Sequence, residues 1–113
     1  MATVENFKKL VLSFAETECA PHFDKTAFLF KKKIWATLDE TKQLACFKLS
    51  LEEQSVFCAF DSAIIYPVKN KWGLQGWTLV ELKKIRLAML KDIASTAYYE
   101  KAQGKNKAIK KIE

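Results

Sequence analysis

The sequence predicts a two-layer α+β domain in which helices pack on one face of a five-stranded antiparallel sheet. The chain has 113 residues, half of them apolar, which suits one hydrophobic core and leaves no room for a second. Several apolar runs are short and rich in β-branched and aromatic residues, as strands are, whereas longer segments repeat apolar residues every three or four positions, as helices do. The expected order of these elements is α-β-β-β-α-β-β-α.

The first element is expected to be an amphipathic helix over residues 3–18. Thr3 can cap its start, because a threonine oxygen accepts a hydrogen bond from a backbone N–H of the first turn. Pro21 is expected to end the helix, and residues 20–25 are expected to link it to the first strand. The apolar stripe of this helix consists of Val4, Phe7, Leu10, Val11, Phe14 and Ala15.

Three strands are expected next, over residues 26–30, 34–38 and 42–49, and short polar turns predict that they pair as an antiparallel meander. The first of these turns is unusual. Lys31, Lys32 and Lys33 occupy it in place of the glycine, asparagine or aspartate that the tightest hairpins favour. Three lysines at a hairpin tip must project into water, so this hairpin is a candidate basic wing.

A second helix is expected to begin after Ser50, which can act as an N-cap. Glu53 follows three residues later, and this spacing matches a capping box. Asp61 is expected to end the helix. Residues 64–68 read as a strand, in which Pro67 should lie at an end or an edge because proline has no N–H to donate.

The last two elements are expected to be a strand over residues 76–82 and a helix over residues 83–101, which Gly104 would end. The helix carries an apolar stripe of Ile85, Met89, Ile93 and Ala97. The single domain is therefore expected to span residues 1–104, followed by a basic tail over residues 105–113.

The strand over residues 42–49 has two different faces. Ala45, Phe47 and Leu49 form a wholly apolar face, which should lie against the helices, while the other face carries Leu44, Cys46 and Lys48. We expect Trp35 of the preceding strand to add apolar surface to this second, open face. The open face is then a candidate partner surface, although the C-terminal tail could equally cover it.

Positive charge is concentrated in two places. Residues 101–113 carry a net charge of +4 and Lys31, Lys32 and Lys33 add +3, whereas the whole chain has a formal charge of +6. Such concentration favours an anionic partner such as nucleic acid. Lysine-rich turns and tails are also common as simple solvated surface, so this second interpretation stays open.

Several classes of protein are disfavoured by the sequence. No apolar run approaches the roughly 18 residues that span a bilayer, and the N-terminus lacks the apolar centre of a signal peptide. The three cysteines form no C-x-x-C pair, and the C-x-x-H of Cys19 and His22 lacks the two further ligands that zinc requires. Neither a nucleophile elbow nor a phosphate loop is present. We therefore expect a cytoplasmic protein that is not an enzyme and has no cofactor or metal.

The stretch Trp72-Gly73-x-x-Gly76-Trp77 is the clearest motif, and an ordered series of shorter pieces accompanies it over residues 7–101. With these motifs the chain resembles the MmcQ/YjbR-like family of small bacterial proteins. The resemblance implies a frataxin-like or secretion-chaperone-like α+β fold, a double-wing DNA-binding motif, and a turn at this stretch that enters the last strand. The chain departs from the family pattern in the lysine triplet, where the family commonly has glycine, and in its charged C-terminal extension. The accompanying pieces are Pro21-His22-Phe23, Ala27-Phe28, Lys33-Ile34-Trp35-Ala36 with Leu38, and Phe47-Lys48-Leu49.

Two interpretations of this stretch stay open. Gly73 and Gly76 allow the chain to reverse tightly, and Trp72 can either clamp the turn or serve in addition as a stacking platform for a nucleobase. We expect a DNA-binding or other nucleic-acid-binding protein, monomeric or weakly dimeric and not bound to membranes. The alternative is a protein-interaction module or homodimer that uses the open sheet face. The residues expected to contact nucleic acid are Lys31, Lys32, Lys33, Lys48, Lys69, Lys71 and Trp72.

Overall fold

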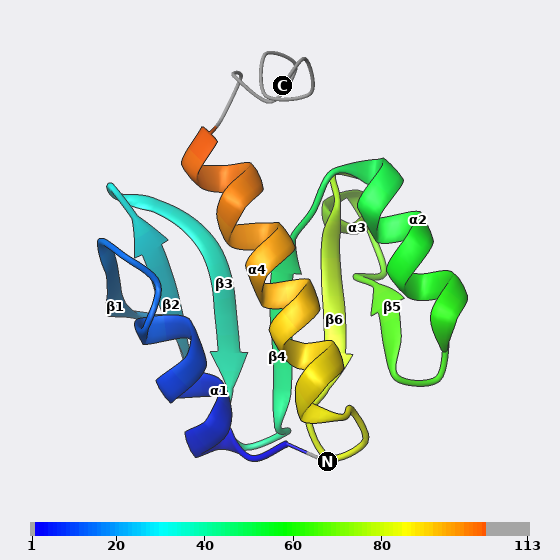
Figure 1. Ribbon diagram of the computed structural model, residues 1–113, viewed down its shortest axis with the longest axis horizontal. Coiled ribbons are helices and arrows are strands. Elements are labelled where there is room, and N and C mark those ends of the chain that lie inside the picture. The colour runs from blue at the N-terminus through cyan, green and yellow to red at the C-terminus, as the bar shows by residue number, and fades with distance from the viewer. Residues whose placement is uncertain (1, 104–113) are drawn as a thin grey trace.

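The computed structural model describes residues 2–103, and within that range the chain forms an antiparallel sheet of six strands with helices on it (Figure 1). The strand order is β1-β2-β3-β4-β6-β5, so that the first four strands are a meander and β6 lies between β4 and β5. The elements are α1 (Val4–Leu12), β1 (Thr17–His22), β2 (Lys25–Phe30), β3 (Lys33–Asp39), β4 (Leu44–Lys48), α2 (Leu51–Phe60), β5 (Ile65–Pro67), α3 (Lys71–Leu74), β6 (Trp77–Glu81) and α4 (Leu87–Gln103).

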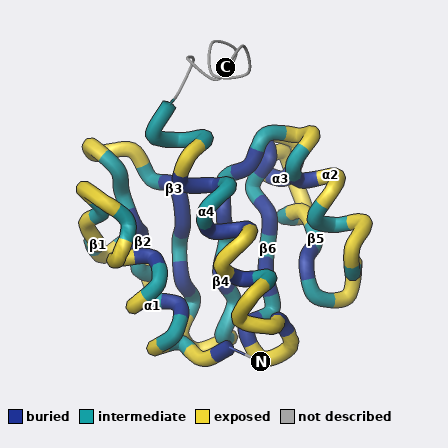
Figure 2. Tube along the Cα trace, viewed as in Figure 1, coloured by how far each residue is buried: buried dark blue, intermediate teal, exposed yellow. Residues whose placement is uncertain are grey.

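The core lies between one face of the sheet and the helices α1 and α4, which pass in front of it in Figure 1. The buried residues lie along the central strands of the sheet (Figure 2). Ala45, Phe47 and Leu49 are all fully buried, which confirms that this face of β4 is the covered one. α2 packs beside β5 at the edge of the sheet. The α+β class and the two-layer arrangement are therefore confirmed.

Local signals for the ends of elements are also confirmed. Thr3 caps α1 and forms a capping box with Asn6, and the Ser50 hydroxyl accepts a hydrogen bond from the backbone N–H of Glu53 at the start of α2. The other half of the expected capping box is wrong, because the backbone N–H of Ser50 donates to Glu100 and not to Glu53. Pro67 ends β5, which is an edge strand, as expected for a residue that cannot donate to a ladder.

The predicted number of strands and order of elements are wrong. The segment expected to be the end of the first helix and its linker is strand β1, and the short helix α3 lies between β5 and β6. α1 ends at Leu12, and Glu16 takes a positive φ of 58° that helps to reverse the chain. The Tyr98 hydroxyl of α4 holds this reversal by donating to the Ala15 carbonyl at 2.7 Å. β1 is an exposed edge strand that pairs with β2 through its backbone, so its side chains show little alternation, and Pro21 is tolerated within it.

The expected position of Trp35 on the open face is also wrong. The pairing of β2 with β3 shifts between Phe28 and Leu29, which are opposite Ala36 and Ile34, so Trp35 is an extra residue in a β-bulge. Its fully buried ring lies on the helix side, 5.7 Å from the ring of Phe14 and 5.4 Å from that of Tyr98. The bulge interrupts the alternation of side chains between the two faces along β3, and the expected position of Trp35 on the open face depends on that alternation.

The last helix begins four residues later than expected. The backbone N–H groups of Lys84 and Ile85 donate to the Glu81 carbonyl, forming a turn between β6 and α4. Gly104, the predicted end of this helix, and the tail over residues 105–113 lie outside the described residues. Among residues 2–103, no helix is long and apolar enough to cross a membrane.

Candidate functional site

The lysine triplet forms the β2–β3 hairpin, as predicted. Lys31 and Lys32 are the two turn residues between the paired Phe30 and Lys33, and their φ angles are 49° and 71°. Two successive positive φ values are typical of a type I′ turn, which Asn-Gly forms with less strain than Lys-Lys. All three lysines are exposed, so the turn presents its charge to solvent.

The loop over residues 70–77 is built for close approach, which confirms the role predicted for its glycines. α3 is a single helical turn whose first N–H groups are capped by Asn70, and its Gly73 lies so near β5 that an added Cβ would come within 1.9 Å of the Val68 oxygen. Gly76 has a φ of +108°, and a Cβ there would lie 1.8 Å from the Leu49 oxygen. Only glycine fits at either position without a shift of the backbone.

A buried side chain that the sequence did not single out closes this loop. The Nε2 of Gln54, from α2, donates to the Gly73 oxygen at 3.0 Å, to the Thr78 hydroxyl at 3.1 Å and to the Trp77 oxygen at 3.3 Å. The Thr78 hydroxyl in turn donates to the Gly76 oxygen at 2.9 Å. The sequence gives no signal for this role, because Gln54 stands among the polar residues Glu52, Glu53 and Ser55, although a buried amide requires such partners.

Trp72 and Trp77 have different surroundings. Trp77 begins β6 and is partly buried, whereas the side chain of Trp72 on α3 is 49% exposed. The Nζ of Lys71 lies 6.0 Å from the centre of the Trp72 ring. Since Gln54 and the glycines hold the loop together, about half of the Trp72 surface is available for contact with a partner.

The residues expected to contact nucleic acid lie along one end of the sheet (Figure 1). β2 ends and β3 begins there, β4 ends and β6 begins there, and α4 also ends there. We call this the basic end. It comprises Lys31, Lys32, Lys33, Lys48, Lys69, Lys71 and Lys101.

A small pocket of about 150 Å³ brings three of these lysines together. Lys33, Lys48 and Lys101 line it with Leu49 and Glu100. Burial, followed by the charges of Lys48 and Lys33, lowers the pKa of Lys101. An anion in this pocket would offset the repulsion among the ammonium groups.

Two contacts in this pocket were outside the prediction. The Nζ of Lys48 donates to the Leu49 oxygen at 3.5 Å, so this side chain reaches the end of the sheet. Glu100 accepts a hydrogen bond of 2.8 Å from the backbone N–H of Ser50. Lys101, at the end of the predicted helix, is not among the residues expected to contact nucleic acid, because its approach to β3 and β4 depends on how α4 packs.

The open face of the sheet contains a groove of about 430 Å³. Thr37, Cys46 and Leu79, from neighbouring central strands, form its floor, and Phe23 and Trp72 border it. We call this the open-face groove. Its complete lining is His22, Phe23, Lys25, Ile34, Thr37, Cys46, Val68, Trp72, Trp77 and Leu79.

Two titratable groups on this face, the Cys46 thiol and the Tyr66 hydroxyl, are held in their neutral forms. Burial raises the pKa of the Cys46 thiol to about 12, so it is protonated at neutral pH and is not an activated nucleophile. Burial and a hydrogen bond donated to Glu81 raise the pKa of Tyr66 to about 12. Of the two, Cys46 lines the groove and gives it a neutral hydrogen-bonding group rather than a reactive one.

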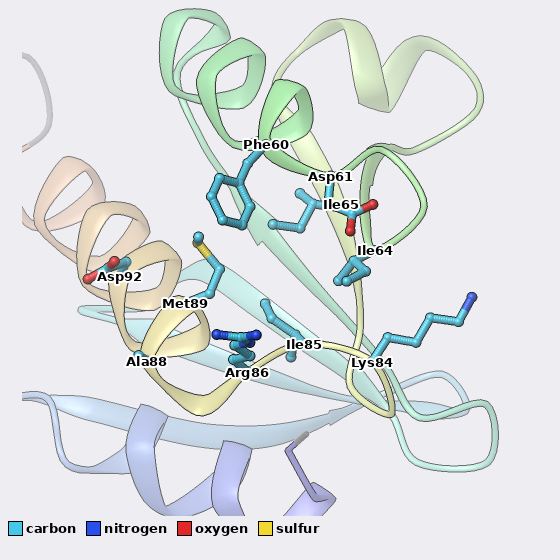
Figure 3. Close-up of a pocket in the computed structure, with 10 residues that line it drawn as sticks. All are labelled: Phe60, Asp61, Ile64, Ile65, Lys84, Ile85, Arg86, Ala88, Met89 and Asp92. Carbon is cyan, nitrogen blue, oxygen red and sulfur yellow. The ribbon is translucent and has the colours of Figure 1, made fainter.

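A second pocket of about 580 Å³ lies on the covered side, between α2, β5 and α4 (Figure 3). Figure 3 shows Phe60 and Met89 pointing toward each other across it. Two acids, Asp61 and Asp92, and two bases, Lys84 and Arg86, surround an apolar floor. Within residues 2–103, no group of three or more histidines, cysteines or acids is placed to hold a metal ion.

Comparison with known proteins finds a likeness of fold. No protein-family model and no curated protein matches the chain. Among solved structures, the Deinococcus radiodurans protein DR2400, with a DUF419 domain, superposes with a TM-score of 0.75 at 18% identity, covering 94% of this chain and 82% of that one. DUF419 is the MmcQ/YjbR-like family, so a protein of the family that the motifs resemble has the same fold.

Proposed function

We propose that the protein is a nucleic-acid-binding protein without enzymatic activity, and that the basic end contacts phosphate groups. The main support is the β2–β3 hairpin, where Lys31 and Lys32 adopt positive φ angles. A left-handed conformation costs roughly 1–2 kcal/mol per residue for side chains other than glycine, asparagine and aspartate. Asparagine and glycine would therefore fit the backbone conformation of this turn better than lysine does. What lysine adds is positive charge.

The remaining basic residues support the same proposal. Lys69 and Lys71 flank Trp72 at the other side of the basic end, and Lys33, Lys48 and Lys101 lie between. Protein ammonium groups that replace condensed cations on phosphates supply most of the sequence-independent affinity for nucleic acid. The sequence has no helix-turn-helix, zinc-finger or aromatic RNP-type signature, so we propose binding with little sequence preference.

We further propose that the chain is a distant member of the MmcQ/YjbR-like family, on the motifs around Trp72 and the shared fold. In that case the β2–β3 hairpin corresponds to one wing of the double-wing motif that the resemblance implies. We also propose a cytoplasmic location, which the free Cys19, Cys46 and Cys58 support because a reducing compartment keeps thiols unpaired.

The test is a binding titration of the full chain against duplex DNA, single-stranded DNA and RNA of equal length over a range of salt concentrations. Phosphate binding requires log affinity to fall linearly with log salt, with a slope of about 0.9 per duplex phosphate neutralised. Replacing Lys31, Lys32 and Lys33 with glutamine should flatten this slope by up to about three. Absence of binding to every nucleic acid at low salt would show that the proposal is wrong.

A protein-interaction module is the second candidate, because the open-face groove is apolar and Phe23 at its border is 94% exposed. This function predicts affinity that depends little on salt. Changes at Phe23 or Leu79 would then weaken partner binding, whereas neutralising Lys31 and Lys32 would leave it intact. The titration above separates the two candidates, because only the first predicts steep salt dependence with nucleic acid.

A further inference from the structure

Two exposed aromatic side chains border the open-face groove from different parts of the fold. Phe23 lies in the two-residue turn between β1 and β2, and Trp72 lies on α3, which precedes β6. Phe23 is 94% exposed and has a φ of 60°, a conformation that bulky residues rarely adopt. Neither burial nor backbone preference explains a phenylalanine here, so its ring is available to a ligand.

The groove has the size and chemistry of a site for a flat ring. Its volume of about 430 Å³ falls within the range of small-molecule sites, and most of its lining is apolar or aromatic. Thr37 and Cys46 on the floor add a hydroxyl and a protonated thiol. Such a site favours a ring with apolar faces and a few polar atoms at its edge, which describes a nucleobase.

Positive charge adjoins the same groove. Lys71 is next to Trp72 and its Nζ lies 6.0 Å from the indole ring, while Lys69 is exposed in the same loop. Lys25 lines the groove at the other side, where Asp24 partly offsets its charge at 3.5 Å. A ligand that joins a flat ring to an anionic group would therefore be complementary to the groove and to its rim.

We propose that the open-face groove accepts one unpaired base of a single-stranded nucleic acid, stacked on Trp72, while the adjoining phosphates contact Lys69 and Lys71. The base must be unpaired because a duplex keeps its bases stacked inside the helix, out of reach of a groove on a sheet. This inference rests on the proposed function and specifies it: the preferred class is single-stranded, and the base as well as the backbone is bound.

The test compares three fluorescently labelled oligonucleotides of equal length: a single strand, the same single strand with abasic sites at every position, and a duplex. The full chain should bind the ordinary single strand roughly tenfold more tightly than the abasic one at equal salt, since stacking on an aromatic side chain contributes about that much per base. The ordinary single strand should also quench tryptophan fluorescence, because Trp72 and Trp77 both line the groove.

Three variants locate the site. Trp72→Ala should reduce affinity for the ordinary single strand roughly tenfold while leaving the salt slope unchanged, because a stacking contact releases no counterions. Phe23→Asn should also weaken binding without harming the fold, since asparagine accepts the positive φ at this position. Leu74→Ala, a change on the same short helix at a side chain that is 78% exposed, is the matched control and should bind as the wild type does.

Each outcome distinguishes this inference from the function on which it rests. Equal binding to the ordinary and abasic strands would overturn the base site and leave phosphate binding standing. Tighter binding to the duplex than to the single strand would do the same. Absence of binding to all three oligonucleotides would overturn both proposals. If Trp72→Ala melts far below the wild type, Phe23→Asn and the abasic strand still decide the question.

Discussion

Two tight turns at the basic end solve the same problem of chain reversal in different ways. The loop over residues 70–77 uses Gly73 and Gly76 where no other residue fits, and it is locked by the buried amide of Gln54. The β2–β3 turn places Lys31 and Lys32 at positive φ, where glycine or asparagine would be less strained, and leaves them in solvent. The residues of the glycine loop suit its backbone conformation, whereas those of the β2–β3 turn strain the backbone and add positive charge.

The comparison separates what the fold requires from what a partner requires. In the glycine loop, packing explains Gly73 and Gly76 and a hydrogen bond explains Asn70, whereas the ring of Trp72 is left half exposed. At the hairpin, the Nζ of Lys31 lies 5.4 Å from the centre of the Phe30 ring, but this contact does not require a lysine at positive φ. Backbone strain that packing does not explain is frequent at functional sites. We therefore expect substitutions in the hairpin to change nucleic-acid binding and stability in different directions.

The largest expected effect is the loss of stability in Gly73→Ala and Gly76→Val. The new Cβ would meet a backbone oxygen at 1.9 Å in the first and at 1.8 Å in the second, so the chain must shift. We expect each change to lower the free energy of unfolding by at least about 2–3 kcal/mol, by the general cost of strain and overpacking. Chemical denaturation measures this, with Leu74→Ala as a neutral control. Unchanged stability in either glycine variant would mean that the loop is not constrained as described.

The next effect concerns the polar network that closes the glycine loop. Gln54→Leu keeps a side chain of similar volume but leaves the Gly73 and Trp77 oxygens without this donor. We expect a loss of about 1–3 kcal/mol, because the variant loses up to three hydrogen bonds that contribute about 0.5–1.5 kcal/mol each. The Gly73 and Trp77 oxygens keep the hydrogen bonds that the backbone N–H groups of Gly76 and Val68 donate to them. Ser55→Ala, at an exposed position on the same helix, is the control. Equal stability of these two variants would show that the amide contributes nothing.

The hairpin should respond in the opposite direction. Lys31→Asn combined with Lys32→Gly supplies the residues that a type I′ turn favours, so the double variant should be more stable by about 1–2 kcal/mol. Lys83→Gln combined with Lys84→Gln removes the same charge at the opposite end of the sheet and should change stability by less than about 0.5 kcal/mol. A destabilised hairpin variant would contradict the view that these lysines are strained.

The smallest expected effect at neutral pH lies between the turns, on the floor of the open-face groove. Because the pKa of Cys46 is raised to about 12 in the folded state, its thiol stays protonated while the unfolded chain ionises from about pH 9 upward. Its contribution to stability is therefore complete below pH 9 and is lost as the pH rises toward 12. Melting temperatures of Cys46→Ser should decline less steeply over this range than those of the wild type. A thiol reagent at pH 8 should modify the exposed Cys19 well before Cys46.

The sequence predicts those features that depend on local pattern. The β2–β3 hairpin follows from two strand-like runs with a charged interval, and the need for glycine at positions 73 and 76 follows from a compact turn between elements. β1 does not follow, because an edge strand held by backbone pairing leaves little trace in its side chains. The burial of Trp35 does not follow either, since a bulge reverses the alternation.

Parts of the candidate site depend on packing between distant segments. Gln54 reaches an oxygen 19 residues along the chain, and no local pattern predicts that partner. The approach of Lys101 to Lys33 and Lys48 depends on where α4 crosses the sheet. Phe23 belonged to a piece of the family motif, but its exposure became evident only with the β1–β2 turn. The sequence alone identifies lysines as candidates for contact with nucleic acid. Only the packing of the helices and strands shows that Lys33, Lys48 and Lys101 lie close together.

The central claim is that the β2–β3 turn has lysines for phosphate binding rather than for shape, and one comparison tests it most directly. The salt dependence of nucleic-acid affinity is measured for the wild type and for two variants that each remove two positive charges: Lys31→Asn with Lys32→Gly, and Lys83→Gln with Lys84→Gln. The hairpin variant should flatten the slope by up to about two, whereas the second variant should leave the slope nearly unchanged. Equal slopes in the two variants would contradict the central claim, because charge at the hairpin would then count no more than charge elsewhere.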